Sequence, residues 1–146
     1  MRELASGEVY MLEECLRELA EHHNSVSVYF RGQYPKKPFG DTLASFEKDI
    51  AGGRSRICVI ENDGRISGFC KTDITGASGA IDYLIVLREC RGSGYGNMLM
   101  EWAMDVFAQS GVRTIEVKVA DGNNAIDFYE KYGFKPNAHI LRMDIK

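Results

Sequence analysis

Apolar side chains recur every three or four residues in two stretches of the chain, which predicts two amphipathic helices. The first stretch starts near residue 9, and its apolar face is formed by Val9, Leu12, Leu16, Leu19 and His23. The second starts after residue 97, and its apolar face is formed by Met98, Leu99, Trp102, Ala103, Val106 and Phe107. It stops at Ser110 and Gly111, a typical helix end. Each helix should pack one side on a core.

Two shorter helices are predicted from their end signals. Residues 41–53 begin with Asp41, a good N-cap residue, and stop at two glycines. Residues 123–134 begin with Asn123 or Asn124 as cap and end at Gly133, which suits a left-handed C-terminal position. The segment between the first and second helices contains aromatics, glycine and two prolines, and is expected to form a loop.

The remaining apolar patterns predict strands. Two β-prone runs within residues 55–74 flank Asn62, Asp63 and Gly64, which indicates a hairpin. Residues 80–87, "AIDYLIVL", are nearly all apolar, as in a central strand buried on both faces. Residues 113–120 and 139–146 alternate between apolar and polar positions. The element order predicts one α/β (α+β) domain over residues 1–146, a mixed sheet with helices on both faces.

Composition narrows the class of protein. The 146 residues carry a net charge of −3, which disfavours a nucleic-acid binder. There is no apolar run of roughly 18 residues and no signal-peptide pattern, so we expect a cytoplasmic protein without a membrane partner. The cysteines are scattered, with no metal-ligand spacing, and should be reduced thiols without a metal: Cys15, Cys58, Cys70 and Cys90.

A glycine-rich turn, "RECRGSGYGNML" at residues 88–99, joins a predicted strand to a predicted helix. A Walker loop is excluded, because Asn97 and the apolar residues after it replace the required lysine and hydroxyl residue. A dinucleotide fingerprint lacks its third glycine, since Asn97 occupies that position. The pattern RxxGxG is satisfied by Arg91, Gly94 and Gly96. Such a turn can direct backbone N–H groups at an anion, with the arginine adding positive charge.

This turn and a second segment together resemble the GNAT-type N-acetyltransferase superfamily, which binds acetyl-CoA. The first family pattern is matched by Val86, Glu89, Arg91, Gly92, Gly94 and Gly96. The second is matched by Ala125, Phe128, Tyr129, Lys131, Gly133 and Phe134. Arg88 replaces the usual proline, and Gly122 stands where the family has asparagine, so Asn123 or Asn124 would take that role. The element order fits along almost the whole chain.

The resemblance implies a GNAT fold with a splayed central strand at the acetyl-CoA site. Backbone groups of Leu84, Ile85 and Val86 would pair with the pantetheine arm. The pyrophosphate would lie on the turn formed by Arg91, Gly92, Ser93, Gly94, Tyr95, Gly96 and Asn97. Asn123, Asn124, Phe128 and Tyr129 would complete the cofactor site.

Three side chains are candidates for acid–base chemistry. Tyr129 matches the family tyrosine that protonates the coenzyme A thiolate. Asp82 is the charged residue within an apolar strand, where an ionised group is costly unless paired or useful, and it is the first candidate for general base. His23 is the alternative base, with Asp73 and Glu116 as weaker candidates, and deprotonation through water needs no single base.

The resulting hypothesis is an N-acetyltransferase that moves acetyl from acetyl-CoA to a primary amine by direct attack in a ternary complex, without a metal. The rival hypothesis is a non-catalytic module that binds acyl-CoA and regulates. The acceptor, a small molecule or a peptide, would be shaped by residues 22–40, whose sequence does not select one amine. Dimers are common in the family, so a homodimer is compatible with the resemblance.

Overall fold

The fold is built on a mixed β-sheet. The computed structural model describes residues 1–119 and 125–145. Within these residues the sheet has five strands in the order β1-β2-β3-β4-β5. The strands are β1 (Arg2–Glu3), β2 (Ser55–Asn62), β3 (Arg65–Thr75), β4 (Ser78–Val86) and β5 (Thr114–Val117). Neighbours are antiparallel except β4 and β5, which run parallel.

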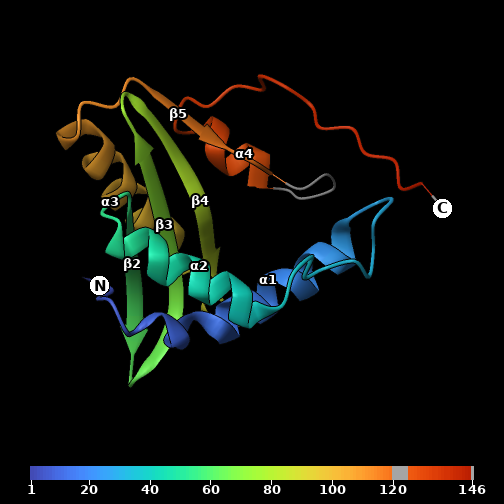
Figure 1. Cartoon of the computed structure of the whole chain (residues 1–146), viewed down its shortest axis with the longest axis horizontal. Helices are drawn as coiled ribbons and strands as arrows, with labels where there is room; N and C mark the ends of the chain where they lie inside the picture. The colour runs from blue at the N-terminus through green and yellow to red at the C-terminus, as the bar shows by residue number, and fades with distance from the viewer. Residues whose placement is uncertain (120–124, 146) are drawn as a thin grey trace.

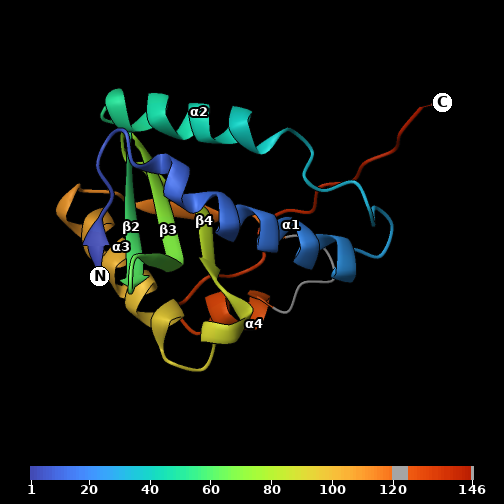
Figure 2. The same ribbon diagram turned by 90° about the horizontal axis from the view of Figure 1, so that it is seen from below.

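Helices cover both faces of this sheet. The helical elements are η1 (Val9–Leu12), α1 (Glu13–Val26), α2 (Phe39–Ala51), η2 (Arg88–Cys90), α3 (Tyr95–Gln109) and α4 (Ala125–Glu130). Figure 2 shows α1 and α2 on one side of the strands and α3 and α4 on the other. The predicted fold class, a mixed sheet between two helical layers, is therefore confirmed.

The alternation of side chains along β2 and β3 divides the core into two clusters. Ile57, Val59 and Phe69 pack toward α1 and α2. Cys58 and Cys70, each next in sequence to one of these residues, pack toward α3 and α4. Both faces of the hairpin are thus buried, because successive side chains of a strand point to opposite sides.

The predicted hairpin turn is confirmed. Asn62 pairs with Arg65, which leaves a two-residue loop of Asp63 and Gly64. Both loop residues have positive φ, 52° and 79°. Positive φ at both positions is what the favoured two-residue turn requires, and Asp-Gly supplies it at low steric cost.

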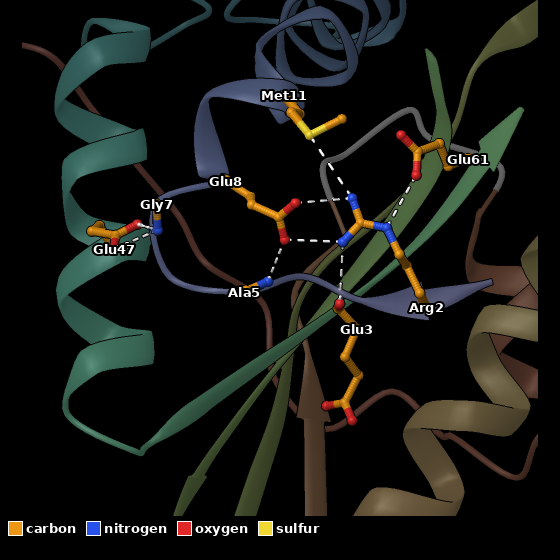
Figure 3. Close-up of polar contacts among 8 residues, drawn as sticks. All are labelled: Arg2, Glu3, Ala5, Gly7, Glu8, Met11, Glu47 and Glu61. Atoms are coloured by element: carbon orange, nitrogen blue, oxygen red, sulfur yellow. Dashed lines mark hydrogen bonds and ion pairs between the residues drawn. The ribbon is translucent and has the colours of Figure 1, made fainter. Parts of the chain in front are cut away.

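The two-residue strand β1 was not predicted, and it is held by ion pairs that a hydrophobic pattern does not reveal. Figure 3 shows the Arg2 guanidinium between Glu8, at 2.9 and 3.1 Å, and Glu61 of β2, at 3.0 Å. Beside it, the Gly7 amide donates to both carboxylate oxygens of Glu47 in α2. The N-terminal segment is thereby fixed to β2 and α2.

The structure corrects one predicted helix start and one predicted strand, and it does not describe the residues of a second predicted helix start. Asp41 is not an N-cap, because α2 begins two residues earlier and Pro38 occupies the cap position. Asn123 and Asn124 lie outside the described residues. The strand at residues 80–87 is not buried throughout, since Asp82 is exposed.

The last strand predicted, residues 139–146, is wrong. Residues 134–145 form no helix or strand, and Figure 1 shows this segment running as an extended trace away from the sheet. Leu141 is 92% exposed and Ile145 is 87% exposed. The segment touches residues before α2 instead, where the Arg142 guanidinium lies over the Phe30 ring. Alternation makes a segment amphipathic, but a strand also needs a neighbour to pair with.

Three further expectations concern the length of one strand, the cysteines and membrane-spanning helices. The strand predicted at residues 113–120 is shorter in the structure, which assigns β5 to Thr114–Val117. All four cysteines are free thiols, and three of them are buried. Across the described part of the chain, no helix has the length and apolar character needed to traverse a lipid bilayer.

Candidate acyl-transfer site

The sheet opens between β4 and β5. The two strands pair from Ser78 with Thr114 to Ile81 with Val117. Strand β4 then continues to Val86 while β5 ends. Within the described residues, the β4 edge beyond Ile81 has no partner strand on this side. This is the splayed central strand that the sequence analysis expected, and it includes Leu84, Ile85 and Val86.

A β-bulge lies where the strands begin to diverge. Lys71 of β3 pairs with Tyr83 of β4, and the next residue, Thr72, pairs with Ile81. Asp82 is therefore the extra residue of β4 and has no partner across the ladder. Bulges of this kind re-aim a side chain next to an active site.

A cavity of about 240 Å³ occupies the opening. It is lined from α1, β4, the end of β5 and α4, by Leu19, His23, Ile81, Asp82, Tyr83, Leu84, Val117, Lys118, Val119, Ala125 and Tyr129. All three predicted acid–base residues, His23, Asp82 and Tyr129, thus border one cavity although they come from three elements. Of the weaker candidates, Asp73 and Glu116 line a different hollow.

Tyr129 is suited to donate a proton into this cavity. Its side chain is 7% exposed and is held in α4 between the rings of Phe128 and Phe134. Among the described residues its hydroxyl makes no hydrogen bond. Burial, and to a smaller extent neighbouring Cys70, raises the pKa of the Tyr129 phenol. The phenol is therefore protonated at neutral pH and free to donate.

His23 occupies the opposite wall. Its ring lies edge-on to Tyr34, with 4.8 Å between the ring centroids. Burial lowers the pKa of His23, and the charges of His22 and Lys36 lower it further. The imidazole is neutral near pH 7, so it can accept a proton but carries no charge with which to attract an amine.

Asp82 enters the cavity from the bulge of β4. Its side chain is 39% exposed, and its Oδ2 lies 2.8 Å from Nζ of Lys71. Among the described residues its other oxygen, Oδ1, accepts no hydrogen bond. The carboxylate therefore has one oxygen held by the protein and one available to a ligand.

Lys71 is the residue that sequence reasoning missed. Its side chain is fully buried, yet its ammonium is close to three carboxylates: Asp73 at 2.7 Å, Asp82 at 2.8 Å and Asp49 of α2 at 3.0 Å. A signal was present, because a lysine in a buried β-prone run needs an acidic partner, as does an aspartate in a buried strand. The two predicted strands that carry these residues follow one another in the chain, so a pair of Lys71 and Asp82 could have been considered.

Burial alone would lower the pKa of Lys71. Hydrogen bonds to Asp73 and Asp82, together with the charge of Asp82, outweigh burial and raise the pKa above its ordinary value. Lys71 is therefore protonated at neutral pH, and its ammonium lies 5.1 Å from the centroid of the Phe46 ring.

The glycine-rich turn lies at the far end of β4 and begins α3. Gly92 and Gly94 have φ of 87° and 81°, in the left-handed region that other residues rarely adopt. Gly94 is the N-cap of α3, and no side chain caps the helix there. The first backbone N–H groups of α3, at residues 95–97, lack partners within the helix and can receive an anion.

Side chains around the turn connect it to neighbouring elements. The Arg91 Nε donates to the Val86 carbonyl at 3.2 Å, which ties the turn to β4. The Asn97 side chain accepts a hydrogen bond from the Tyr132 hydroxyl at 2.6 Å. A Cβ on Gly96 would meet the Phe128 ring at 3.6 Å, so helix α3 and helix α4 approach closely here. Tyr95 is reached by the Asn62 amide at 3.3 Å, and Ser93 is exposed.

The fit of acetyl-CoA can be judged from these features. An unpaired strand edge, a turn with open space around Gly92 and Gly94, and free N–H groups at a helix start lie in succession along residues 82–97. A pantetheine amide chain needs main-chain partners, and a pyrophosphate needs N–H donors. The residues present provide both kinds of group in the order that the molecule would need.

Comparison with solved structures shows the same fold. The tetramutant of the BH1408 protein from Bacillus halodurans superposes with a TM-score of 0.77 at 20% identity, covering 99% of this chain and 98% of that one. An acetyltransferase from Trypanosoma brucei has a TM-score of 0.71 at 22% identity, covering 99% and 97%. A predicted acetyltransferase from Clostridium acetobutylicum, solved with acetyl-CoA, has a TM-score of 0.76 at 15% identity, covering 98% and 94%. At these identities the likeness concerns the fold alone.

No curated protein matches the chain. The model of the acetyltransferase (GNAT) family matches residues 17–134, from the middle of α1 to the end of the turn after α4. This range contains the splayed strand, the glycine-rich turn and the three candidate acid–base residues His23, Asp82 and Tyr129. The chain therefore belongs to the GNAT acetyltransferase family.

Proposed function

We propose that the protein is an N-acetyltransferase that transfers the acetyl group of acetyl-CoA to a primary amine. The observation that carries the proposal is the cavity where β4 leaves β5, because a proton donor and two proton acceptors border it. A regulatory module that only binds acyl-CoA would need the strand edge and the turn. Such a module would not need Tyr129, Asp82 and His23 to line the same cavity.

The cofactor would be held largely by main-chain groups. The β4 edge at Leu84, Ile85 and Val86 would receive the pantetheine arm as an added strand. The N–H groups at residues 95–97 would receive the pyrophosphate, with Arg91 contributing charge from beside Val86. Acetyl-CoA supplies an activated thioester, and direct attack by the amine then needs correct positioning and two proton transfers.

The protein's own side chains would make those transfers. Asp82 is a carboxylate and attracts a positively charged ammonium group. Its Oδ1, which Lys71 does not hold, would bind the amine and take its proton. His23, neutral across the cavity, would be the second acceptor. Tyr129 would donate its hydroxyl proton to the departing sulfur, because its side chain borders the cavity and the phenol is protonated at neutral pH.

Ligand-dependent melting tests the cofactor assignment. Acetyl-CoA and coenzyme A should raise the melting temperature, whereas NAD and ATP should not, because a ligand that binds only the folded state stabilises it. A shift with NAD or ATP alone would contradict the assignment. A panel of small amines and peptides is then assayed for release of free thiol.

Tyr129→Phe tests whether the site is catalytic. We expect kcat to fall by about 100-fold, with acetyl-CoA affinity unchanged, because only the proton donor is removed. Tyr10→Phe is the matched control, since Tyr10 is 69% exposed on η1. Unchanged kcat in Tyr129→Phe would remove the proposed acid, and acetyl-CoA binding without turnover of any amine in the wild type would favour the regulatory module.

A further inference from the structure

The ion pairs of Lys71 connect the proposed acceptor site to the interior of the protein. The Lys71 side chain has no exposed surface, and its ammonium is surrounded by Asp49, Asp73 and Asp82. Of these three carboxylates only Asp82 borders the cavity where Tyr129 lies. Lys71 itself is not among the residues that line the cavity, so it can act on a bound amine only through Asp82.

The backbone alone does not fix the Asp82 side chain. Asp82 is the bulged residue of β4 and faces no residue of β3 in the ladder, so it lacks the cross-strand neighbour that normally restrains a strand side chain. More than a third of the side chain is exposed. The contact from Oδ2 to Lys71, at 2.8 Å, is the one polar contact of its carboxylate within the described residues.

The lysine is in turn anchored from two sides. Asp73 lies two residues along β3 and also accepts a hydrogen bond from Ser55. Asp49 reaches Lys71 from α2 and also pairs with Arg54. Lys71 therefore has a defined position before Asp82 is considered, and Asp82 is the one of the three carboxylates whose only polar contact within the described residues is Lys71.

We propose that Lys71 is a positioning residue of the acetyl-transfer site, which holds Oδ2 of Asp82 so that Oδ1 faces the acceptor amine. This role rests on the proposed function. Lys71 touches no substrate; it orders the group that does. A second consequence is electrostatic: without the ammonium, Asp73 and Asp82 would lose the cation that they share, and Asp49 would keep only its ion pair with Arg54.

The experiment compares Lys71→Met, Asp82→Asn and Asp49→Asn with the wild type, each as the full chain below its melting temperature. Lys71→Met keeps length and volume but removes the charge and the donor. We expect kcat/KM for the amine to fall by about 10- to 100-fold in Lys71→Met and in Asp82→Asn, with the acetyl-CoA Kd within about twofold of wild type. The double variant should be no worse than the poorer single variant, because both changes disrupt the same arrangement.

Asp49→Asn is the matched control. It also removes a carboxylate from Lys71, but one outside the cavity, and the asparagine oxygen can still accept a hydrogen bond. We expect its kcat/KM to stay within about threefold of wild type even where its melting temperature falls. Lys71→Gln retains an N–H donor and should recover part of the activity that Lys71→Met loses, and it also serves where Lys71→Met does not fold.

Unchanged kcat/KM in folded Lys71→Met or Lys71→Gln would overturn the proposal, as would an equal loss in Asp49→Asn, which would mark the cluster as merely structural. Failure of the proposed function is distinguished by the wild type: acetyl-CoA binding without turnover of any amine would overturn both proposals before a variant is compared.

Discussion

Gly68 of β3 offers a test of whether the backbone of β4 contacts the cofactor. A Cβ added at Gly68 would lie 2.7 Å from the Ile85 carbonyl oxygen and 3.2 Å from the Cα of Val86. Real Cβ atoms do not approach an oxygen that closely, so Gly68→Ala must push β4 outward at two of the three residues where we place the pantetheine arm. The change leaves every side chain of the cavity intact.

The size of the effect follows from this overlap. Forcing one methyl group into a closely packed place costs about 1–3 kcal/mol of unfolding free energy. For a chain of this length, that corresponds to a fall in melting temperature of roughly 2–10 °C. If one or two backbone hydrogen bonds to the cofactor are weakened, each worth about 1 kcal/mol, the acetyl-CoA Kd should rise by about 5- to 30-fold.

The assay is thermal melting together with calorimetric titration of acetyl-CoA into Gly68→Ala. Gly40→Ala is the matched control: Gly40 lies in α2, and a Cβ there would meet no atom within 4 Å. It should retain wild-type affinity and gain slightly in stability, because alanine favours helix. A destabilised Gly68→Ala with unchanged acetyl-CoA affinity would refute the main-chain binding mode.

Three further changes have defined outcomes. Gly94→Val forces a β-branched residue to φ of 81°, so it should weaken acetyl-CoA binding at least tenfold; normal calorimetric affinity would contradict the turn assignment. His23 has a lowered pKa, so its contribution to stability is complete above pH 6.5 and declines as the pH falls; His23→Gln should make the melting temperature depend less on pH below about pH 6.5, and an unchanged slope would exclude this contribution. Leu141→Ser should change the unfolding free energy by less than about 0.5 kcal/mol in urea titration, whereas Leu99→Ala should cost about 2–5 kcal/mol; a large loss for Leu141→Ser would show that the C-terminal segment packs in solution.

Local signals were sufficient where structure depends on nearby residues. The Asp63-Gly64 turn, the apolar faces of α1 and α3, and the glycine-rich turn before α3 all follow from sequence spacing, and the structure has them. The gathering of His23, Asp82 and Tyr129 followed from the family resemblance, which implied how the predicted elements are arranged around the acetyl-CoA site.

Features that depend on contacts between distant segments could not be predicted in this way. The bulge that places Asp82 arises from the register of β3 against β4, which no property of either strand alone sets. The third carboxylate on Lys71, that of Asp49, arrives from α2, which is distant in sequence. The C-terminal segment shows the reverse case, since residues 139–145 alternate like a strand but have no neighbouring strand in the structure.

Along the open edge of β4, ligand binding and core packing depend on different parts of the strand. Its main-chain groups that are not paired with β3 face the gap left by β5, while side chains such as Ile85 belong to the core. A ligand bound through peptide groups imposes no side-chain identity, so Ile85 can be exchanged for another residue of equal volume without altering the bonds offered to the ligand. The constraint falls instead on neighbouring small residues, Gly68 above all, whose missing side chain sets how close the strands may lie. Ligand binding through main-chain groups can therefore persist while most side chains of the strand are substituted.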